Sequence, residues 1–304
     1  MNSSPYSLRR PGFSRFLEVR GLRYHVLQWG EPKLVTPERP PLVMLHGWMD
    51  VGASFQFVVD AFSADRFVLA LDWRGFGLSD SGGTDTYWVH DYLADLEAVL
   101  DALVPDQAVD LLGHSMGGNV AMVYAGVRPQ RIRRLINLEG FGMPNSTPPQ
   151  APRRIAQWLD ELKLPMRLRR YDSVEAVADR LRETNPLLTE QHAAWLAQHW
   201  SRQADDGQWD ILGDPAHKRT GPLPYRKDEV LECWKRIEAP VMWVEGDQTE
   251  IGKLWGNRYP REEFEASIAC VPRLERHVLS PAGHMVHHDQ PQDLARRVEA
   301  FLAP

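Results

Sequence analysis

The stretch 113–117, Gly-His-Ser-Met-Gly, constrains the fold of this chain more than any other feature of the sequence. It follows an apolar run, 109–112, typical of a buried strand, and it precedes an apolar run, 120–124, that suits a helix. A sharp turn from strand to helix strains the middle residue, and the flanking glycines leave room for the neighbouring strand and helix. We therefore expect the Ser115 hydroxyl to lie exposed at the carboxyl edge of a sheet, beside free helix amides.

Strand-like and helix-like segments alternate through the first half of the chain. The runs 41–45 and 67–71 are apolar and are bounded by Pro, Asp or Gly, as buried parallel strands are. Leucines at helical spacing lie between residues 91 and 103, and another apolar run follows at 135–138. This rhythm predicts an α/β fold with a mostly parallel sheet flanked by helices.

The texture of the sequence changes near residue 144, where four prolines open a stretch without a convincing buried strand before Val241. An amphipathic helical face lies within that stretch, whereas the runs 241–244 and 277–279 are typical of core strands. We therefore predict a core domain made of residues 1–144 and 237–304, with a helical cap domain at 145–236 inserted between its two parts.

Composition excludes several classes of function. The net charge of −6 offers no footprint for nucleic acid. The two cysteines stand in unrelated contexts and suggest neither a metal site nor a disulfide framework. No apolar run is long enough to span a bilayer, and the N-terminal residues lack the apolar core of a signal peptide, so we expect a cytoplasmic location. The oligomeric state leaves no mark on the sequence.

A serine needs a base to take its proton before it can act as a nucleophile at neutral pH. His284 follows Gly283 on the loop after the predicted strand 277–279, C-terminal to the serine as this chain order requires. His287 and His288 are competitors nearby, but neither stands at the junction of strand and loop. We expect His284 to be the base.

An oxyanion that forms during attack on a carbonyl needs at least two amide donors. One candidate is the backbone amide of Met116, directly after the serine. The other is the amide of Trp48, because Gly47 allows a turn after the early strand 41–45 that aims this amide inward.

Four motifs now resemble a known family in their order and spacing. They are His46-Gly47-Trp48, Asp72-Trp73-Arg74-Gly75-Phe76-Gly77-Leu78-Ser79, the stretch 113–118, and Gly283-His284. Together they resemble the α/β-hydrolase fold, in particular the capped branch of serine-hydrolase-like proteins, esterases, C–C-bond hydrolases, epoxide hydrolases and dehalogenases. The resemblance covers nearly the whole chain and implies an eight-stranded sheet and a Ser/acid/His triad. It also implies that residues 72–79 form a structural loop.

The acid of the triad is where the sequence departs from this family. The resemblance implies an acid after the penultimate core strand, but Thr249 holds that position and cannot carry a charge. Asp247 lies two residues earlier, and Glu139 follows the run 135–138, where some members of the fold place their acid. We favour Glu139 over Asp247, because a carboxylate among apolar residues needs a partner such as His284.

A serine at position 115 argues against the epoxide hydrolases and dehalogenases of this fold, which use an aspartate nucleophile. It favours an acyl-enzyme mechanism on a small, largely apolar carboxylic ester, with no metal or organic cofactor. Tryptophans in or beside the cap would make an apolar roof, at positions 158, 195, 200, 209 and 234. Two alternatives stay open: a C–C-bond hydrolase with the same triad, and a catalytically silent ligand-binding or scaffold protein.

Overall fold

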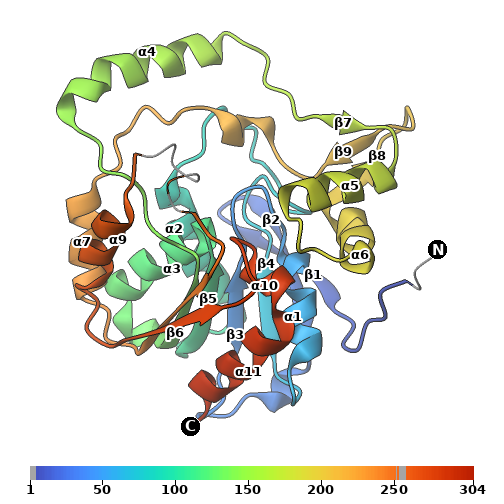
Figure 1. Cartoon of the computed structure of the whole chain (residues 1–304), viewed down its shortest axis with the longest axis vertical. Helices are drawn as coiled ribbons and strands as arrows, with labels where there is room; N and C mark the ends of the chain where they lie inside the picture. Colours follow the sequence, from blue (N-terminus) through green and yellow to red (C-terminus); the bar gives the residue numbers. More distant parts are fainter. Residues whose placement is uncertain (1–4, 251, 253–257) are drawn as a thin grey trace.

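The computed structural model describes residues 5–250, 252 and 258–304, and its centre is an eight-stranded sheet (Figure 1). The strands are β1 (Phe13–Val19), β2 (Leu22–Trp29), β3 (Leu42–Leu45), β4 (Val68–Leu71), β5 (Val109–His114), β6 (Ile132–Leu138), β10 (Val241–Gly246) and β11 (Leu274–Leu279). Their order is β1-β2-β4-β3-β5-β6-β10-β11. Strands β3, β4, β5, β6, β10 and β11 pair in parallel, whereas β2 pairs antiparallel with both β1 and β4. The prediction of a mostly parallel eight-stranded sheet is therefore confirmed.

Strand β1 is absent from the sequence-based interpretation for a physical reason. It lies at the edge of the sheet, where it pairs only with β2, and most of its residues are exposed on both faces. A strand that buries neither face shows no alternation of apolar and polar residues. Its sequence therefore carries no periodic signal.

Helices cover both faces of the sheet. They are α1 (Gln56–Ala61), α2 (Val89–Leu103), α3 (Met116–Val127), α7 (Lys227–Lys235), α9 (Arg261–Ile268), α10 (Val286–Asp289) and α11 (Pro291–Leu302). Successive residues of a strand point to opposite faces, so Val43 joins one core beneath α2, α3, α7 and α9, whereas Met44 joins another beneath α1 and α11. Short 3₁₀ turns complete the fold: η1 (Pro32–Leu34), η2 (Gly52–Phe55), η3 (Pro129–Arg131), η4 (Pro148–Gln150) and η5 (Pro215–Lys218).

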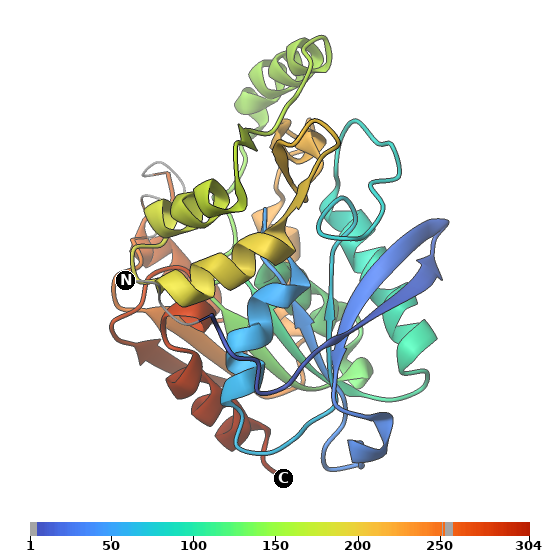
Figure 2. The same ribbon diagram turned by 90° about the vertical axis from the view of Figure 1, so that its right-hand side faces the viewer.

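The segment between β6 and β10 carries α4 (Ala151–Leu162), α5 (Val174–Thr184) and α6 (Glu190–Trp200). It also carries a small sheet of β7 (Arg170–Tyr171), β9 (Trp209–Ile211) and β8 (Ser201–Gln203), which is absent from the sequence-based interpretation. These strands have two or three residues each, too few to show alternation in the sequence. Figures 1 and 2 show the segment above one end of the main sheet, with α4 projecting farthest.

Two parts of this insertion contact the core. Helices α5 and α6 share an apolar cluster with Val51 and Phe57, at the start of the helical segment that follows β3. Helix α7 packs against α3, and a Cβ at Gly126 would meet the backbone of Cys233 at 1.9 Å. We keep 145–236 as the proposed cap segment, although α7 at its end joins the helix layer of the core. Among the described residues, no helix is long and apolar enough to cross a membrane.

Candidate active site

Ser115 occupies the sharp turn between β5 and α3. Its backbone has φ 50° and ψ −113°, a conformation that side-chain-bearing residues rarely adopt. A Cβ at Gly113 would lie 2.4 Å from the carbonyl oxygen of Gly117, and one at Gly117 would lie 2.2 Å from that of Leu45. Strand and helix therefore approach each other as closely as the sequence pattern predicts, because both positions lack a side chain.

His284 lies within hydrogen-bond distance of Ser115, although the two residues are far apart in the sequence. Its Nε2 is 3.0 Å from Ser115 Oγ. Two contacts hold the His284 loop: the ring of His114 donates from Nε2 to the carbonyl of His284 at 2.8 Å, and the amide of Gly283 donates to Asp289 at 2.8 Å. His114, the residue directly before the serine, thus fixes the backbone position of His284.

Glu139 lies at the end of β6, on the opposite side of the His284 ring. Its Oε2 is 3.0 Å from Nδ1 of His284. Its Oε1 accepts hydrogen bonds from the amide of Gly246 at 2.6 Å and from the hydroxyl of Thr249 at 3.0 Å. The side chain is buried, and burial raises the pKa of Glu139, while His284, Gly246 and Thr249 oppose that rise.

The other sequence candidate for the acid, Asp247, makes different contacts. Its carboxylate accepts hydrogen bonds from the hydroxyl of Ser280 at 2.6 Å and from the amide of Ala282 at 2.9 Å. The Ser280 hydrogen bond in particular lowers the pKa of Asp247. Asp247 thus supports the loop that leads to His284, whereas Glu139 contacts the imidazole itself.

The loop after β3 passes close to the serine at Gly47. A Cβ at this position would lie 3.2 Å from Cβ of Ser115 and 2.8 Å from Nδ1 of His114. The carbonyl of Gly47 accepts a hydrogen bond from Nδ1 of His46 at 2.7 Å, because Nε2 of that ring accepts one from the amide of Trp73. The carbonyl and amide of a trans peptide point in opposite directions, so His46 orients the amide of Trp48.

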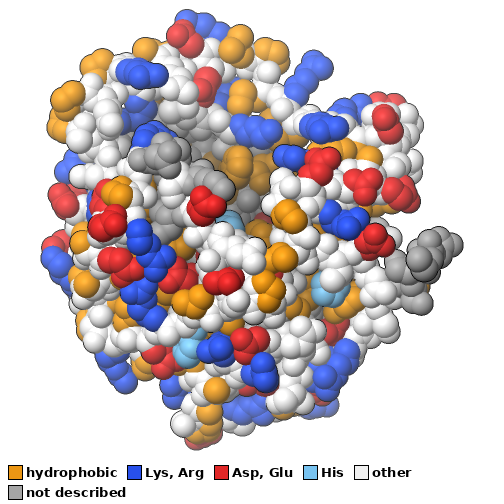
Figure 3. Space-filling model, viewed as in Figure 1, with side chains coloured by type: hydrophobic (Ala, Val, Ile, Leu, Met, Phe, Trp, Pro, Cys, Tyr) orange, Lys and Arg blue, Asp and Glu red, His pale blue; other side chains and the backbone are white. Residues whose placement is uncertain are grey.

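The remaining site residues take the following positions. Met116 is the first residue of α3, where helix amides have no partner within the helix. The Trp48 side chain is half-exposed, and its indole donates to the carbonyl of His217 at 3.3 Å. Trp234, expected in or beside the cap, lies on α7 and its side chain is buried in the core of the sheet domain. The face in Figure 3 is hollowed below α4, and hydrophobic side chains gather in the hollow.

Three further side chains lie close together near the site, and only His287 among them enters the sequence-based interpretation, as a competitor of His284 for the base. Asp50, His114 and His287 are buried, and each has a possible metal-ligand atom within 4.8 Å of those of the other two. Burial lowers the pKa of His114 well below that of an ordinary imidazole. The position of His114 inside the 113–117 motif and the adjacent pair 287–288 were the available signals, but nothing in the sequence says that their side chains converge.

A mostly parallel sheet with a serine on a strained turn between a strand and a helix, here β5 and α3, is characteristic of the α/β-hydrolase fold. The model of the α/β hydrolase fold family matches residues 40–291, so the chain belongs to this family. It is therefore identified as a hydrolase of the α/β fold.

Individual relatives agree with this family. A serine hydrolase-like protein of Danio rerio is 28% identical over 87% of this chain and 82% of its own length. Esterase YbfF of Escherichia coli (strain K12) is 22% identical over 86% of this chain and 92% of its own length. Among solved structures, a thioesterase domain from the curacin biosynthetic pathway superposes with a TM-score of 0.81 and 28% identity, covering 95% of this chain and 99% of the other.

Proposed function

We propose that this protein is a serine hydrolase that cleaves a small, largely apolar carboxylic ester through an acyl-enzyme intermediate. The observation that carries the proposal is the pair of 3.0 Å contacts that His284 makes, through Nε2 to Ser115 and through Nδ1 to Glu139. Serine, imidazole and carboxylate in this order are the parts that acyl transfer requires.

The roles follow from the atoms that can donate and accept. An ionised carboxylate only accepts hydrogen bonds, so Glu139 selects the tautomer of His284 that carries its proton on Nδ1. Nε2 then holds a lone pair that faces the hydroxyl of Ser115. Glu139 also stabilises the imidazolium that forms when Nε2 takes the proton.

In the first half-reaction, Ser115 Oγ attacks the ester carbonyl carbon while His284 Nε2 takes its proton. The carbonyl π electrons move to oxygen, and the amides of Trp48 and Met116 stabilise this oxyanion. One such donor lowers the barrier by about 3–4 kcal/mol. The intermediate collapses, the bond to the alcohol oxygen breaks, and His284 gives the proton to the leaving alcohol. Water then attacks the acyl carbon while His284 Nε2 takes a proton from it. The bond between the acyl carbon and Ser115 Oγ breaks, His284 returns the proton to Oγ, and the acid leaves.

Figure 3 shows a hollow below α4 in which hydrophobic side chains gather, and we infer that this hollow accepts an apolar acyl group. A second candidate reaction is thioester hydrolysis. It is supported by the similarity to the curacin thioesterase domain, and it uses the same attack on a carbonyl. The two reactions differ only in the leaving group, which is an alcohol oxygen for the ester and a thiol sulfur for the thioester.

The test is a series of p-nitrophenyl esters from acetate to octanoate, together with matched oxygen and sulfur esters of one acid. We expect hydrolysis by the wild type, a preference among acyl lengths, and loss of activity in Ser115→Ala. A wild type that hydrolyses none of these esters would contradict the proposal. A clear preference for the sulfur ester of the matched pair would instead select thioester hydrolysis.

A further inference from the structure

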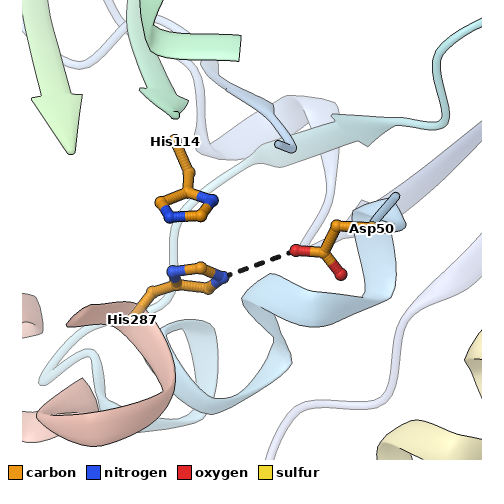
Figure 4. Close-up of side chains that lie close together, drawn as sticks. All are labelled: Asp50, His114 and His287. Atoms are coloured by element: carbon orange, nitrogen blue, oxygen red, sulfur yellow. Dashed lines mark ion pairs between the residues drawn. The ribbon is translucent and has the colours of Figure 1, made fainter. Parts of the chain in front are cut away.

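Asp50, His114 and His287 form a buried cluster (Figure 4). It adjoins the proposed active site through His114, which directly precedes Ser115 and donates to the carbonyl of His284. Asp50 lies on the loop after β3, His114 ends β5, and His287 lies on α10. The three residues are 5%, 2% and 0% exposed, respectively, so the cluster is shielded from bulk water. Groups of this polarity are buried at a cost unless they are paired.

Two atoms that face this cluster have no hydrogen-bond partner among the residues that the structure describes. They are Oδ2 of Asp50 and Nδ1 of His114. Nε2 of His287 forms an ion pair with Oδ2 of Asp50 at 3.7 Å when the imidazole is protonated (dashed line in Figure 4), and this distance is too long for a hydrogen bond. Apart from this ion pair, Oδ2 of Asp50 and Nδ1 of His114 offer electron pairs without a donor, and a bound cation would take up both.

The surroundings of His114 match those of a metal-binding imidazole. Its Nε2 donates to the carbonyl of His284, so a neutral ring leaves the lone pair on Nδ1. Metal-ligating histidines typically donate their other ring nitrogen to a carbonyl or a carboxylate in this way. This hydrogen bond fixes both the tautomer and the orientation of the ring.

The geometry also fits a small tetrahedral ion. Zinc bonds of about 2.0–2.1 Å place neighbouring ligand atoms roughly 3.4 Å apart, close to the separation of the Asp50 and His287 atoms. The hydroxyl of Ser54 contacts Nε2 of both His287 and His288. When this hydroxyl donates to His288, the proton of His287 can sit on Nδ1, which has no hydrogen-bond acceptor among the described residues, and its Nε2 is then free to bind a metal.

We propose that Asp50, His114 and His287 bind a divalent transition metal such as Zn²⁺, and that the bound metal slows hydrolysis. Two imidazole nitrogens and one carboxylate oxygen suit zinc, whereas calcium and magnesium prefer all-oxygen sites. A solvent molecule or the hydroxyl of Ser54 can complete four-coordination.

The expected inhibition by the metal follows from the positions of its three ligands in the sequence. The inference of inhibition rests on the proposed function. Asp50 is two residues after Trp48, His114 directly precedes Ser115, and His287 is three residues after His284. Coordination draws ligand atoms that now spread over up to 4.8 Å toward one centre, and it pulls on all three active-site segments. A misplacement of about 1 Å at a catalytic group can cost about 10²-fold in rate.

The binding test uses full-length, untagged, metal-free protein. Equilibrium dialysis against ZnCl₂ with elemental analysis gives the stoichiometry, and visible absorption of the Co²⁺ form reports four-coordination. Asp50→Asn and His287→Asn remove ligands, whereas His90→Asn alters an exposed histidine on α2 as the matched control. We expect one Zn²⁺ per chain for the wild type and the control, and at least about tenfold weaker binding in both cluster variants.

The outcomes separate the two parts of the proposal. A wild type that binds no Zn²⁺, or cluster variants that bind it as tightly as the wild type, overturns the site. Circular dichroism and melting of the metal-free variants show whether each one folds, and Asp50→Asn keeps the shape of the side chain. Full activity of the zinc-loaded wild type overturns inhibition. A protein without esterase activity even when metal-free refutes the proposed function and leaves the dialysis result intact.

Discussion

The hydroxyl of Thr249 lies 3.0 Å from Oε1 of Glu139. Thr249 stands where the family resemblance implies the triad acid, and Glu139 follows β6, the strand that pairs with β10. The two positions for an acid therefore converge on one side of His284, although they belong to different strands. A carboxylate from either strand end can approach the imidazole, and in this chain the threonine contacts the carboxylate instead.

The proposed acid is tested by comparing Glu139→Gln with Asp247→Asn. A glutamine amide donates to Nδ1 of His284, so the ring takes the tautomer that cannot accept the proton of Ser115. We expect kcat of Glu139→Gln to fall by about 10³–10⁴-fold, as for a triad that holds the wrong tautomer. Asp247→Asn should lose less than about tenfold, because it weakens only loop contacts.

Melting curves provide the control for this comparison. Burial raises the pKa of Glu139, so the folded state binds this proton more tightly than the unfolded state does. The contribution of this group to stability therefore falls as pH rises from the unfolded to the folded pKa, and at neutral pH the buried charge is unfavourable. Glu139→Gln removes that charge and should melt no lower than the wild type. A larger loss of kcat in Asp247→Asn than in Glu139→Gln would contradict the assignment of Glu139 as the acid.

Thr249→Val tests the hydrogen bond to the acid. The hydroxyl of Thr249 lowers the pKa of Glu139, so its removal should raise that pKa further. The reaction needs the ionised carboxylate of Glu139. As the pH is lowered, kcat/KM of Thr249→Val should therefore begin to fall at a higher pH than kcat/KM of the wild type does. Thr249→Ser retains a hydroxyl and should follow the wild type. Identical profiles for the two variants would show that the hydroxyl does not influence the acid.

Strain at Ser115 predicts an unusual order of stability. Its φ of 50° disfavours any side chain, so Ser115→Gly relieves strain that Ser115→Ala keeps. We expect the glycine variant to be more stable than the alanine variant by about 1 kcal/mol, and both to be inactive. Urea unfolding of the two variants measures the difference. A less stable glycine variant would mean that the turn is not strained in solution.

Gly47→Ala tests the loop that carries the Trp48 amide. The added methyl would meet Nδ1 of His114 at 2.8 Å, so the loop must move away from the serine. Loss of one oxyanion donor costs about 10²–10³-fold in kcat, and we expect a loss of that order with a smaller change in KM. Gly221→Ala, where a Cβ meets nothing within 4 Å, is the matched control. Normal activity of Gly47→Ala would argue against the Trp48 amide as a donor.

The sequence predicts those parts of the fold that bury apolar residues in a regular period. The runs 41–45, 67–71, 109–112 and 135–138 all coincide with buried strands of the sheet, because a parallel strand covered on both faces is mostly apolar. Asp110 is the exception, a buried carboxylate that pairs with Arg66 and Arg133. The exposed edge strand β1 and the strands of the small sheet, each two or three residues long, carry no such signal.

The candidate site likewise contains residues that the sequence alone identifies and residues that only the structure identifies. Ser115 and His284 stand in local motifs with fixed chain order, so the sequence alone identifies them as candidates. The choice between Glu139 and Asp247 depends on which side chain reaches His284 in space, and periodicity does not give side-chain directions. Asp50 and His287 come together only through the packing of α10 against the loop after β3, which no local pattern encodes.

The central claim is that His284 makes Ser115 nucleophilic, and covalent labelling tests it most directly. A fluorophosphonate probe should add one phosphonyl group to the wild type, and peptide mass spectrometry should locate it on Ser115. Ser115→Ala should take up no label, and His284→Ala should label far more slowly than the wild type. An unlabelled wild type, or equal labelling rates for the wild type and His284→Ala, would contradict the claim.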